Sequence, residues 1–182
     1  EKAFSLICYF LKSCTKDDLS TQQLDIIEKT TLSLYRDKTL KRLEAYSKEN
    51  NIDCNKAMFY KNNLLPSLNE IAKHCIEMTL ALPLSPGILH GDLCFSNILF
   101  DSRLESIKVI DPRGITESGN ITIFGDQKYD LAKLTHSVIG LYDFIIAGRY
   151  TLIPSGEANA EINFDIDERI FNLQERFFDF KF

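Results

Sequence analysis

The chain has 182 residues, of which 45% are hydrophobic and 26% are charged, and its formal net charge is −5 with a pI near 5.3. This balance is typical of a folded globular protein and excludes a disordered chain. The acidic net charge disfavours a nucleic-acid partner, because phosphate recognition needs a surplus of lysine and arginine. The sequence has no apolar run of about 18 residues, so it predicts neither a membrane span nor a membrane partner.

The five cysteines are scattered along the chain, and no two of them form a C-x-x-C pair. Their odd number and wide spacing disfavour a zinc knuckle or a redox dithiol and favour free thiols in a reducing compartment. The first residues lack the charged start and the cleavage site of a signal peptide, and they include no initiator methionine. We therefore expect a cytoplasmic protein, and a chain that is one part of a longer protein.

The first 86 residues predict a helical region. Every glycine and both valines of the chain come after it, which leaves little material for hairpins and strands. Capping boxes, formed by Ser20 with Gln23 and by Ser67 with Glu70, mark the expected starts of two helices. The polar segment 50–63 interrupts the helical periodicity, so we expect a loop or a lid there.

After residue 86 the pattern changes to short apolar runs at 88–89, 97–100 and 107–110. Polar residues separate the last two runs, so we expect short strands of which the last two form a hairpin. Helical spacing returns after Gly125, and a final helix follows an expected loop at 154–160.

The predicted fold class is therefore α+β and mostly α. Along the chain we expect a helical part at 1–86, functional loops at 87–125 and a second helical part at 126–182.

Polar residues suited to phosphoryl transfer are concentrated between His90 and Asp111. Asp92 follows His90 closely, Asn97 comes five residues later, and Asp111 ends an apolar strand. A carboxylate can orient and deprotonate an acceptor hydroxyl, while Mg²⁺ takes few oxygen ligands from the protein and keeps water and phosphate oxygens for the rest. One amide and one carboxylate on neighbouring strand ends meet that requirement.

These residues resemble the aminoglycoside phosphotransferase and choline kinase family of small-molecule kinases. The stretch from His90 to Asn97 matches the family's H-G-D-x-x-x-x-N loop, Ile110-Asp111 matches the strand that ends in I-D, and Asp130 begins a D-L-A match. The resemblance implies the carboxy-terminal lobe of a protein-kinase-like fold, in which a helical bundle carries the catalytic and metal loops on short β-hairpins. It also implies Mg²⁺ and ATP as cofactors.

The family's roles can be carried over residue by residue. The resemblance implies that Asp92 is the catalytic base and that Asn97 and Asp111 are magnesium ligands. It further implies that His90 holds the loop and that Asp130 braces the loop from a helix.

Two stretches depart from the family's pattern. Pro112 and Arg113 follow Asp111, where the family usually has an aromatic or a small residue. Arg113 either contacts a phosphate or an anionic acceptor, or it is a solvent-exposed turn residue. Cys94 and Phe95 replace the small residues common in the loop, and they either shape the acceptor pocket or pack in the core.

The family holds ATP under a strand-rich amino-terminal lobe. The region before residue 87 shows neither a glycine loop nor a strand pattern, so it does not predict such a lobe. We therefore expect the carboxy-terminal lobe alone, with little turnover by itself and with the amino-terminal lobe or a fused domain as its partner.

Three functions follow from these observations. The first is transfer of the γ-phosphate of ATP to a hydroxyl of a sugar, an amino alcohol or an aminoglycoside-like acceptor. The second is a non-catalytic kinase-like interaction or regulatory module, which the joint presence of Asp92, Asn97 and Asp111 disfavours. The third is a metal-dependent hydrolase or transferase, whose further ligands would be Asp126, Asp130 or Glu117.

One further acidic pair invites a metal-site interpretation. Asp165 and Asp167 form a D-x-D motif, but they stand where the final helix is expected to begin. Acidic groups at that place interact favourably with the helix dipole, so we interpret the pair as a helix start.

Overall fold

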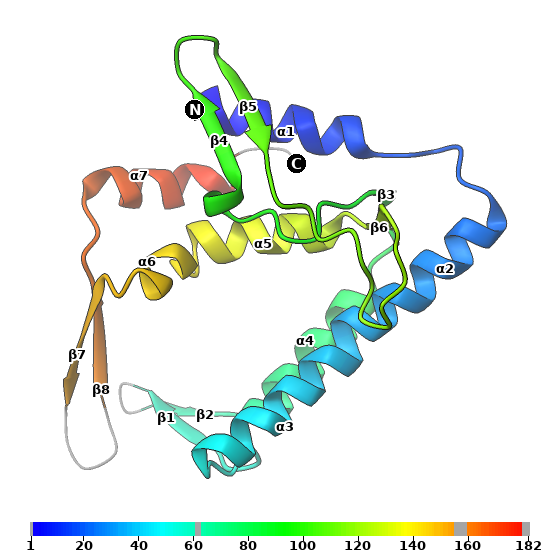
Figure 1. The fold of residues 1–182 in the computed structure, drawn as a ribbon. Coiled ribbons are helices and arrows are strands. Elements are labelled where there is room, and N and C mark those ends of the chain that lie inside the picture. Colours follow the sequence, from blue (N-terminus) through cyan, green and yellow to red (C-terminus); the bar gives the residue numbers. More distant parts are fainter. Residues whose placement is uncertain (1, 61–62, 155–159, 180–182) are drawn as a thin grey trace. The chain divides into compact units, whose positions relative to one another are not determined.

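The computed structural model describes residues 2–60, 63–154 and 160–179. These residues are about half helical and carry small two-stranded sheets, so the predicted α+β class is confirmed (Figure 1). In the described part of the chain, no helix has both the length and the apolar character needed to cross a membrane.

The chain groups into two compact units whose segments alternate along the sequence. Unit 1 contains Glu1–Thr15, Ile88–Gly114 and Gln127–Phe182, and unit 2 contains Lys16–Gly87 and Ile115–Asp126.

Unit 2 is dominated by helices. Its elements are α2 (Thr21–Leu32), the π-helical turn η1 (Ser33–Asp37), α3 (Lys38–Asn50), β1 (Met58–Tyr60), β2 (Asn63–Leu65), α4 (Leu68–Leu80) and β6 (Phe124–Asp126), which pairs with β3 (Pro86–Ile88). Both predicted capping boxes are confirmed: the hydroxyls of Ser20 and Ser67 accept from the backbone N–H groups of Gln23 and Glu70, at 3.3 and 3.2 Å.

The expectation that the first 86 residues are poor material for hairpins is wrong in one place. β1 and β2 form an antiparallel pair in the register Met58↔Leu65, within and beside the segment 50–63 that was expected to be a loop or a lid. Residues 61–62 of that segment lie outside the described residues. Aromatic and leucine side chains have enough β-propensity to form a strand pair without valine or glycine.

Unit 1 carries the residues with candidate chemistry. Its elements are α1 (Lys2–Cys14), the 3₁₀ turn η2 (Phe95–Asn97), β4 (Ile98–Asp101), β5 (Ser106–Val109), α5 (Lys128–Val138), α6 (Tyr142–Ile146), β7 (Tyr150–Pro154), β8 (Ala160–Phe164) and α7 (Glu168–Phe177). The predicted hairpin is confirmed as β4–β5, with the register Ile98↔Val109. Since strand side chains alternate between faces, the face that carries Ile98, Ile107 and Val109 packs against the core.

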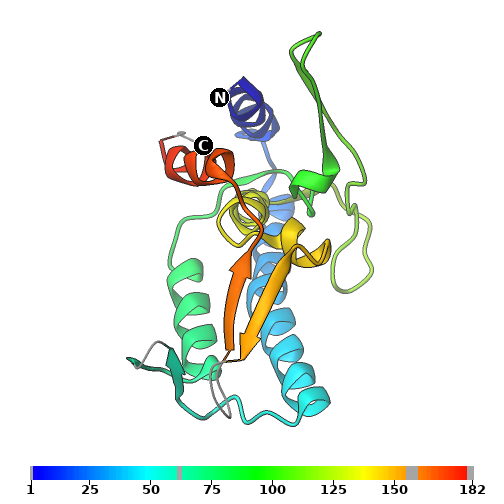
Figure 2. The same cartoon turned by 90° about the vertical axis from the view of Figure 1, so that its left-hand side faces the viewer.

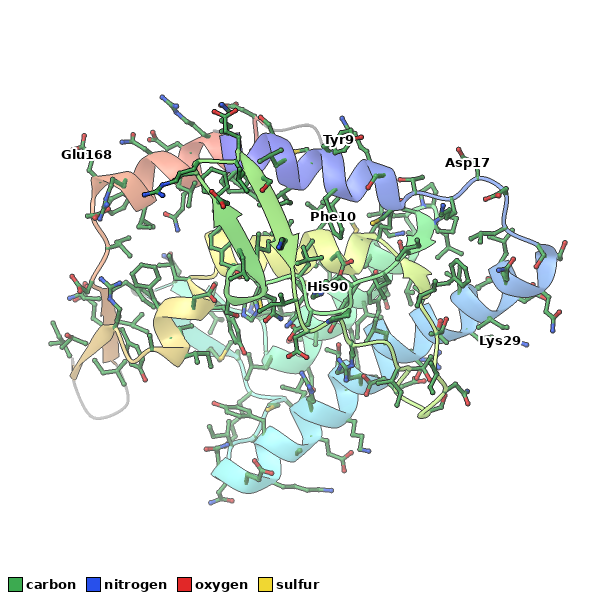
Figure 3. The ribbon with its side chains drawn as sticks, turned by 45° about the horizontal axis from the view of Figure 1, so that its top comes forward. Tyr9, Phe10, Asp17, Lys29, His90 and Glu168 are labelled. Carbon is green, nitrogen blue, oxygen red and sulfur yellow. The ribbon has the colours of Figure 1, made fainter. Side chains whose placement is uncertain are left out.

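The core of unit 1 lies among α1, α5 and α7 (Figure 2). Its buried members are Phe4, Ile7, Leu11, Leu93, Leu134, Val138 and Phe177. The helical spacing explains which side of α1 is buried: Phe10 packs against this core, whereas Tyr9 is 74% exposed and projects from the other side of the helix (Figure 3). Leu93 ties the loop of candidate chemistry directly to this core.

The carboxy-terminal part differs from the prediction, because β7 and β8 form an antiparallel hairpin that the sequence pattern did not predict. Of the expected loop at 154–160, residues 155–159 lie outside the described residues. In the last helix Phe177 is buried, whereas Phe171 is exposed.

The interpretation of the D-x-D pair as a helix start is confirmed. Asp167 is the N-cap of α7, and its carboxylate accepts from the backbone N–H groups of Arg169 and Ile170 at 3.0 and 3.3 Å. Asp165 instead forms an ion pair with Arg149. The two carboxylates are therefore engaged by different groups.

Leu134 tests the core of unit 1, because its side chain is fully buried there. We expect Leu134→Ala to lower the free energy of unfolding by about 2–5 kcal/mol, since it removes buried methyl groups and leaves a cavity. Chemical denaturation measures this loss. Ile146→Ala is the control, because Ile146 is 70% exposed and its truncation should change the free energy by less than about 0.5 kcal/mol. Equal effects of the two substitutions would contradict this core.

Candidate active site

The buried carboxylate of Asp130 holds the loop that precedes η2. One of its oxygens accepts the backbone N–H of His90 at 2.7 Å, and the other accepts the N–H of Gly91 at 2.8 Å. Asp130 is 1% exposed, and this burial raises the pKa of its carboxyl, although the two hydrogen bonds partly oppose the rise. The contact ties α5 to the loop.

His90 links the loop to the segment that follows β5. Its ring Nε2 lies 2.9 Å from the carbonyl oxygen of Ile110, and its Nδ1 accepts the backbone N–H of Asp92 at 3.3 Å. A ring nitrogen beside a carbonyl must donate and one beside an N–H must accept, so these partners assign the hydrogen to Nε2. The backbone carbonyl of His90 also accepts the N–H of Arg113 at 2.8 Å. His90 thus joins the loop to the segment after β5, at the base of the β4–β5 hairpin (Figure 3).

Gly91 has a backbone conformation and a neighbour that only glycine accommodates well. Its φ is +81°, in the left-handed region that residues with a Cβ rarely adopt. A Cβ at this position would lie 2.9 Å from the Cβ of Arg113. Both the backbone conformation and the neighbouring side chain therefore require glycine here.

Asn97 connects the loop at Asp92 with the end of β5 before Asp111. Its side-chain Nδ2 donates to the backbone carbonyl of Asp92 at 2.9 Å, and its own carbonyl accepts the N–H of Ile110 at 3.0 Å. The first contact commits the nitrogen end of the amide, so Oδ1 is the end that remains to bind a ligand. The second contact places Asn97 beside the residue that precedes Asp111.

Asp111 stands just after β5 in an unusual conformation. Its φ is +56°, in the left-handed region, although Pro112 follows and a residue before proline favours an extended backbone. Such strain in a non-glycine residue is common at functional sites. None of the described residues donates a hydrogen bond to the Asp111 carboxylate, and Asp111 is exposed.

Lys133 is a neighbour of Asp92 that the sequence analysis missed. Its Nζ lies 2.7 Å from Oδ1 of Asp92. One sequence signal pointed to it: Lys133 stands three residues after Asp130, the spacing at which two side chains share one face of a helix. The family's pattern assigns no role to a lysine at this position, so the spacing alone did not predict the contact.

The departures from the family's loop have partly structural explanations. Cys94 is 3% exposed, and Phe95 packs against the core with its ring centroid 6.1 Å from that of Phe4. The backbone N–H of Phe95 also donates to the hydroxyl of Ser137 on α5 at 3.1 Å. These contacts favour core packing over pocket lining for both residues. A contact of Arg113 with a phosphate or an acceptor stays a prediction.

The extra ligands needed by a metal-dependent hydrolase are engaged elsewhere. Asp126 accepts from the hydroxyl of Tyr35 at 3.2 Å and from the backbone N–H of Ser85 at 3.2 Å. Glu117 forms an ion pair with Lys38 at 2.7 Å. Within the described ranges, no three His, Cys, Asp or Glu side chains gather in a way that could hold a metal. These contacts disfavour that reading of the site.

The donor set fits Mg²⁺ better than other common metals. Asn97 offers an amide oxygen and Asp111 a carboxylate, both hard ligands, and no thiolate or imidazole joins them in the contacts above. Mg²⁺ typically takes only one or two protein carboxylates or oxygens and keeps water and phosphate oxygens for the rest of its shell.

Comparisons of this chain with protein-family models, with curated proteins and with solved structures give no match.

Gly91 allows a test of how tightly the loop is held. We expect Gly91→Ala to lower the free energy of unfolding by about 1–3 kcal/mol more than Gly148→Ala does. Gly148 also has a positive φ, +66°, but a Cβ there would meet nothing within 4 Å. The control therefore shares the backbone penalty and lacks the clash with Arg113. Equal losses in urea denaturation would show that Arg113 does not pack on the loop.

The raised pKa of Asp130 predicts a pH dependence of stability. The folded chain binds a proton at Asp130 before the unfolded chain does, so this group's contribution to the free energy of unfolding grows on acidification and is lost as the pH rises through the raised pKa. Asp130→Asn cannot titrate. We expect the stability of the unmodified chain, relative to this variant, to increase between neutral pH and pH 3.8, the ordinary pKa of aspartate. A relative decrease in denaturation experiments would contradict the assignment.

Proposed function

We propose that the chain is the catalytic-loop lobe of a small-molecule kinase, which transfers the γ-phosphate of ATP to an acceptor hydroxyl. In this proposal Asp92 accepts the hydroxyl proton, and Asn97 and Asp111 hold Mg²⁺. His90 and Asp130 keep the loop in shape. The ion supplies charge neutralisation for the phosphates.

One observation carries the proposal: a single hydrogen-bonded frame holds Asp92, Asn97 and Asp111 together. The Asn97 side chain donates to the Asp92 carbonyl, and the Asn97 carbonyl accepts from the residue before Asp111. Asp130 fixes the start of this frame through two backbone N–H groups. A base and two oxygen ligands in one hydrogen-bonded frame are what phosphoryl transfer requires, because its catalysis consists mainly of positioning and electrostatic stabilisation.

The exposure of the side chains supports the same function. Leu93 and Cys94 are buried, whereas the Asp92 side chain is 43% exposed and Asp111 is exposed. The loop therefore anchors its apolar residues in the core and leaves the candidate base and the candidate ligand accessible. The carboxylate of Asp130, which holds the loop's backbone, is by contrast buried.

Asp111→Asn tests the metal site. We expect Mn²⁺, added with a non-hydrolysable ATP analogue, to broaden the NMR signals of residues 90–97 and 111–114 in the unmodified chain. The variant should lose this broadening, because it removes the ligand charge, while asparagine tolerates the left-handed backbone as well as aspartate does. A ten-fold or greater loss of Mn²⁺ affinity is expected, on the order of that seen when metal-site groups are altered.

Glu175→Gln is the matched control, since it makes the same charge change at an exposed position of α7. It should leave the broadening as it is in the unmodified chain. Equal broadening in Asp111→Asn, or broadening centred on other residues, would contradict the proposed metal site.

A further inference from the structure

The helix α5 contacts the catalytic loop with two side chains of opposite charge. Asp130 accepts from the loop's backbone N–H groups, and Lys133 pairs with the loop's exposed carboxylate, Asp92, at 2.7 Å. The two residues lie three positions apart and so share one face of the helix. The element that shapes the loop is thus also the one that fixes the direction of its carboxylate.

The environment of Lys133 keeps its ammonium charged and in place. The side chain is only 22% exposed, and Nζ also lies 5.5 Å from the centroid of the Tyr142 ring on α6. Burial by itself lowers the pKa of Lys133, but the hydrogen bond and the charge of Asp92 outweigh it, with smaller contributions from Tyr129 and Cys94, and the net pKa is raised. A partly buried lysine with two contacts loses less conformational entropy on forming an ion pair than an exposed lysine does. The pair therefore differs from an ordinary surface ion pair.

We propose that Lys133 is the positioning residue of this site, holding one oxygen of Asp92 so that the other faces the acceptor hydroxyl. This inference rests on the proposed kinase function. In the step it serves, the acceptor oxygen forms a bond to the γ-phosphorus of ATP and its proton passes to the free oxygen of Asp92. The bond between the γ-phosphorus and the bridging oxygen breaks, and ADP leaves with that electron pair.

The positive charge of Lys133 also suits this role. Without a cation beside it, the Asp92 carboxylate would repel the negatively charged phosphoryl group that must approach the acceptor. The ammonium at 2.7 Å balances the carboxylate and still has N–H donors beyond the one given to Asp92. Because the pair is already neutral, it also gives no attraction to a cationic acceptor, and a neutral or anionic polyol fits it better than an amine.

Calorimetric titration with Mg·ADP, and then with Mg·ADP plus aluminium fluoride, separates positioning from folding. Aluminium fluoride mimics the phosphoryl group in the transition state of its transfer and binds with a water in the acceptor's place. Its affinity therefore depends on how the base is positioned. We expect it to tighten ADP binding in the unmodified chain. In Lys133→Met the factor of tightening should be about 10- to 100-fold smaller, because a displaced catalytic group typically costs that much. Mg·ADP alone should bind both proteins equally, which also shows that the variant is folded.

Two further variants sharpen the comparison. Lys133→Arg keeps the charge and should recover part of the tightening, though not all, since a guanidinium has a different geometry. Lys108→Met removes the same charge from an exposed position on β5 and should leave the tightening unchanged.

The outcomes separate the two proposals. If aluminium fluoride tightens ADP binding equally in the unmodified chain and in Lys133→Met, Lys133 is not a positioning residue and the kinase proposal stands. If the unmodified chain binds Mg·ADP but aluminium fluoride adds nothing to that binding, the kinase proposal fails and this inference fails with it.

Discussion

The site depends on one buried carboxylate that accepts two consecutive backbone N–H groups. A buried charge is costly unless donors surround it, and Asp130 obtains its donors from His90 and Gly91. Consecutive amides in a strand point in different directions, whereas those of His90 and Gly91 converge on one carboxylate, and the left-handed conformation of Gly91 follows directly. From that point the ring and carbonyl of His90 reach the segment after β5, and the loop and the hairpin become one body.

The same loop has to serve the core and the candidate chemistry, and it divides these tasks between neighbouring residues. Leu93 is fully buried, while the adjacent Asp92 carries an accessible carboxylate that Lys133 compensates. The buried Leu93 fixes the position of the adjacent Asp92, while the Asp92 side chain stays accessible. The left-handed backbone of Asp111 lies in the same arrangement, between the Ile110 N–H that donates to Asn97 and the Arg113 N–H that donates to His90.

Local signals in the sequence predicted part of the fold. The capping boxes at Ser20 and Ser67 and the β4–β5 hairpin depend on residues that are close in the chain, so their geometry follows from the local sequence. The β1–β2 and β7–β8 hairpins were missed, because their stability comes from pairing between strands whose composition gives only a weak signal. The pair between Lys133 and Asp92 was missed for a related reason: it exists only after α5 has packed against the loop.

The alternation of the two units has a consequence for how the protein is made. The ring of Phe4 packs against that of Phe177 at 5.8 Å between centroids, so the core of unit 1 includes both the first and the last described helices. During synthesis the part of the α1 face that Phe177 covers therefore remains exposed until α7 has left the ribosome, while the whole sequence of unit 2 has already emerged. Such a delayed, long-range closure slows folding and lengthens the exposure of an aggregation-prone surface. A chaperone that holds α1 during this interval would serve this chain more than one that acts on the finished protein.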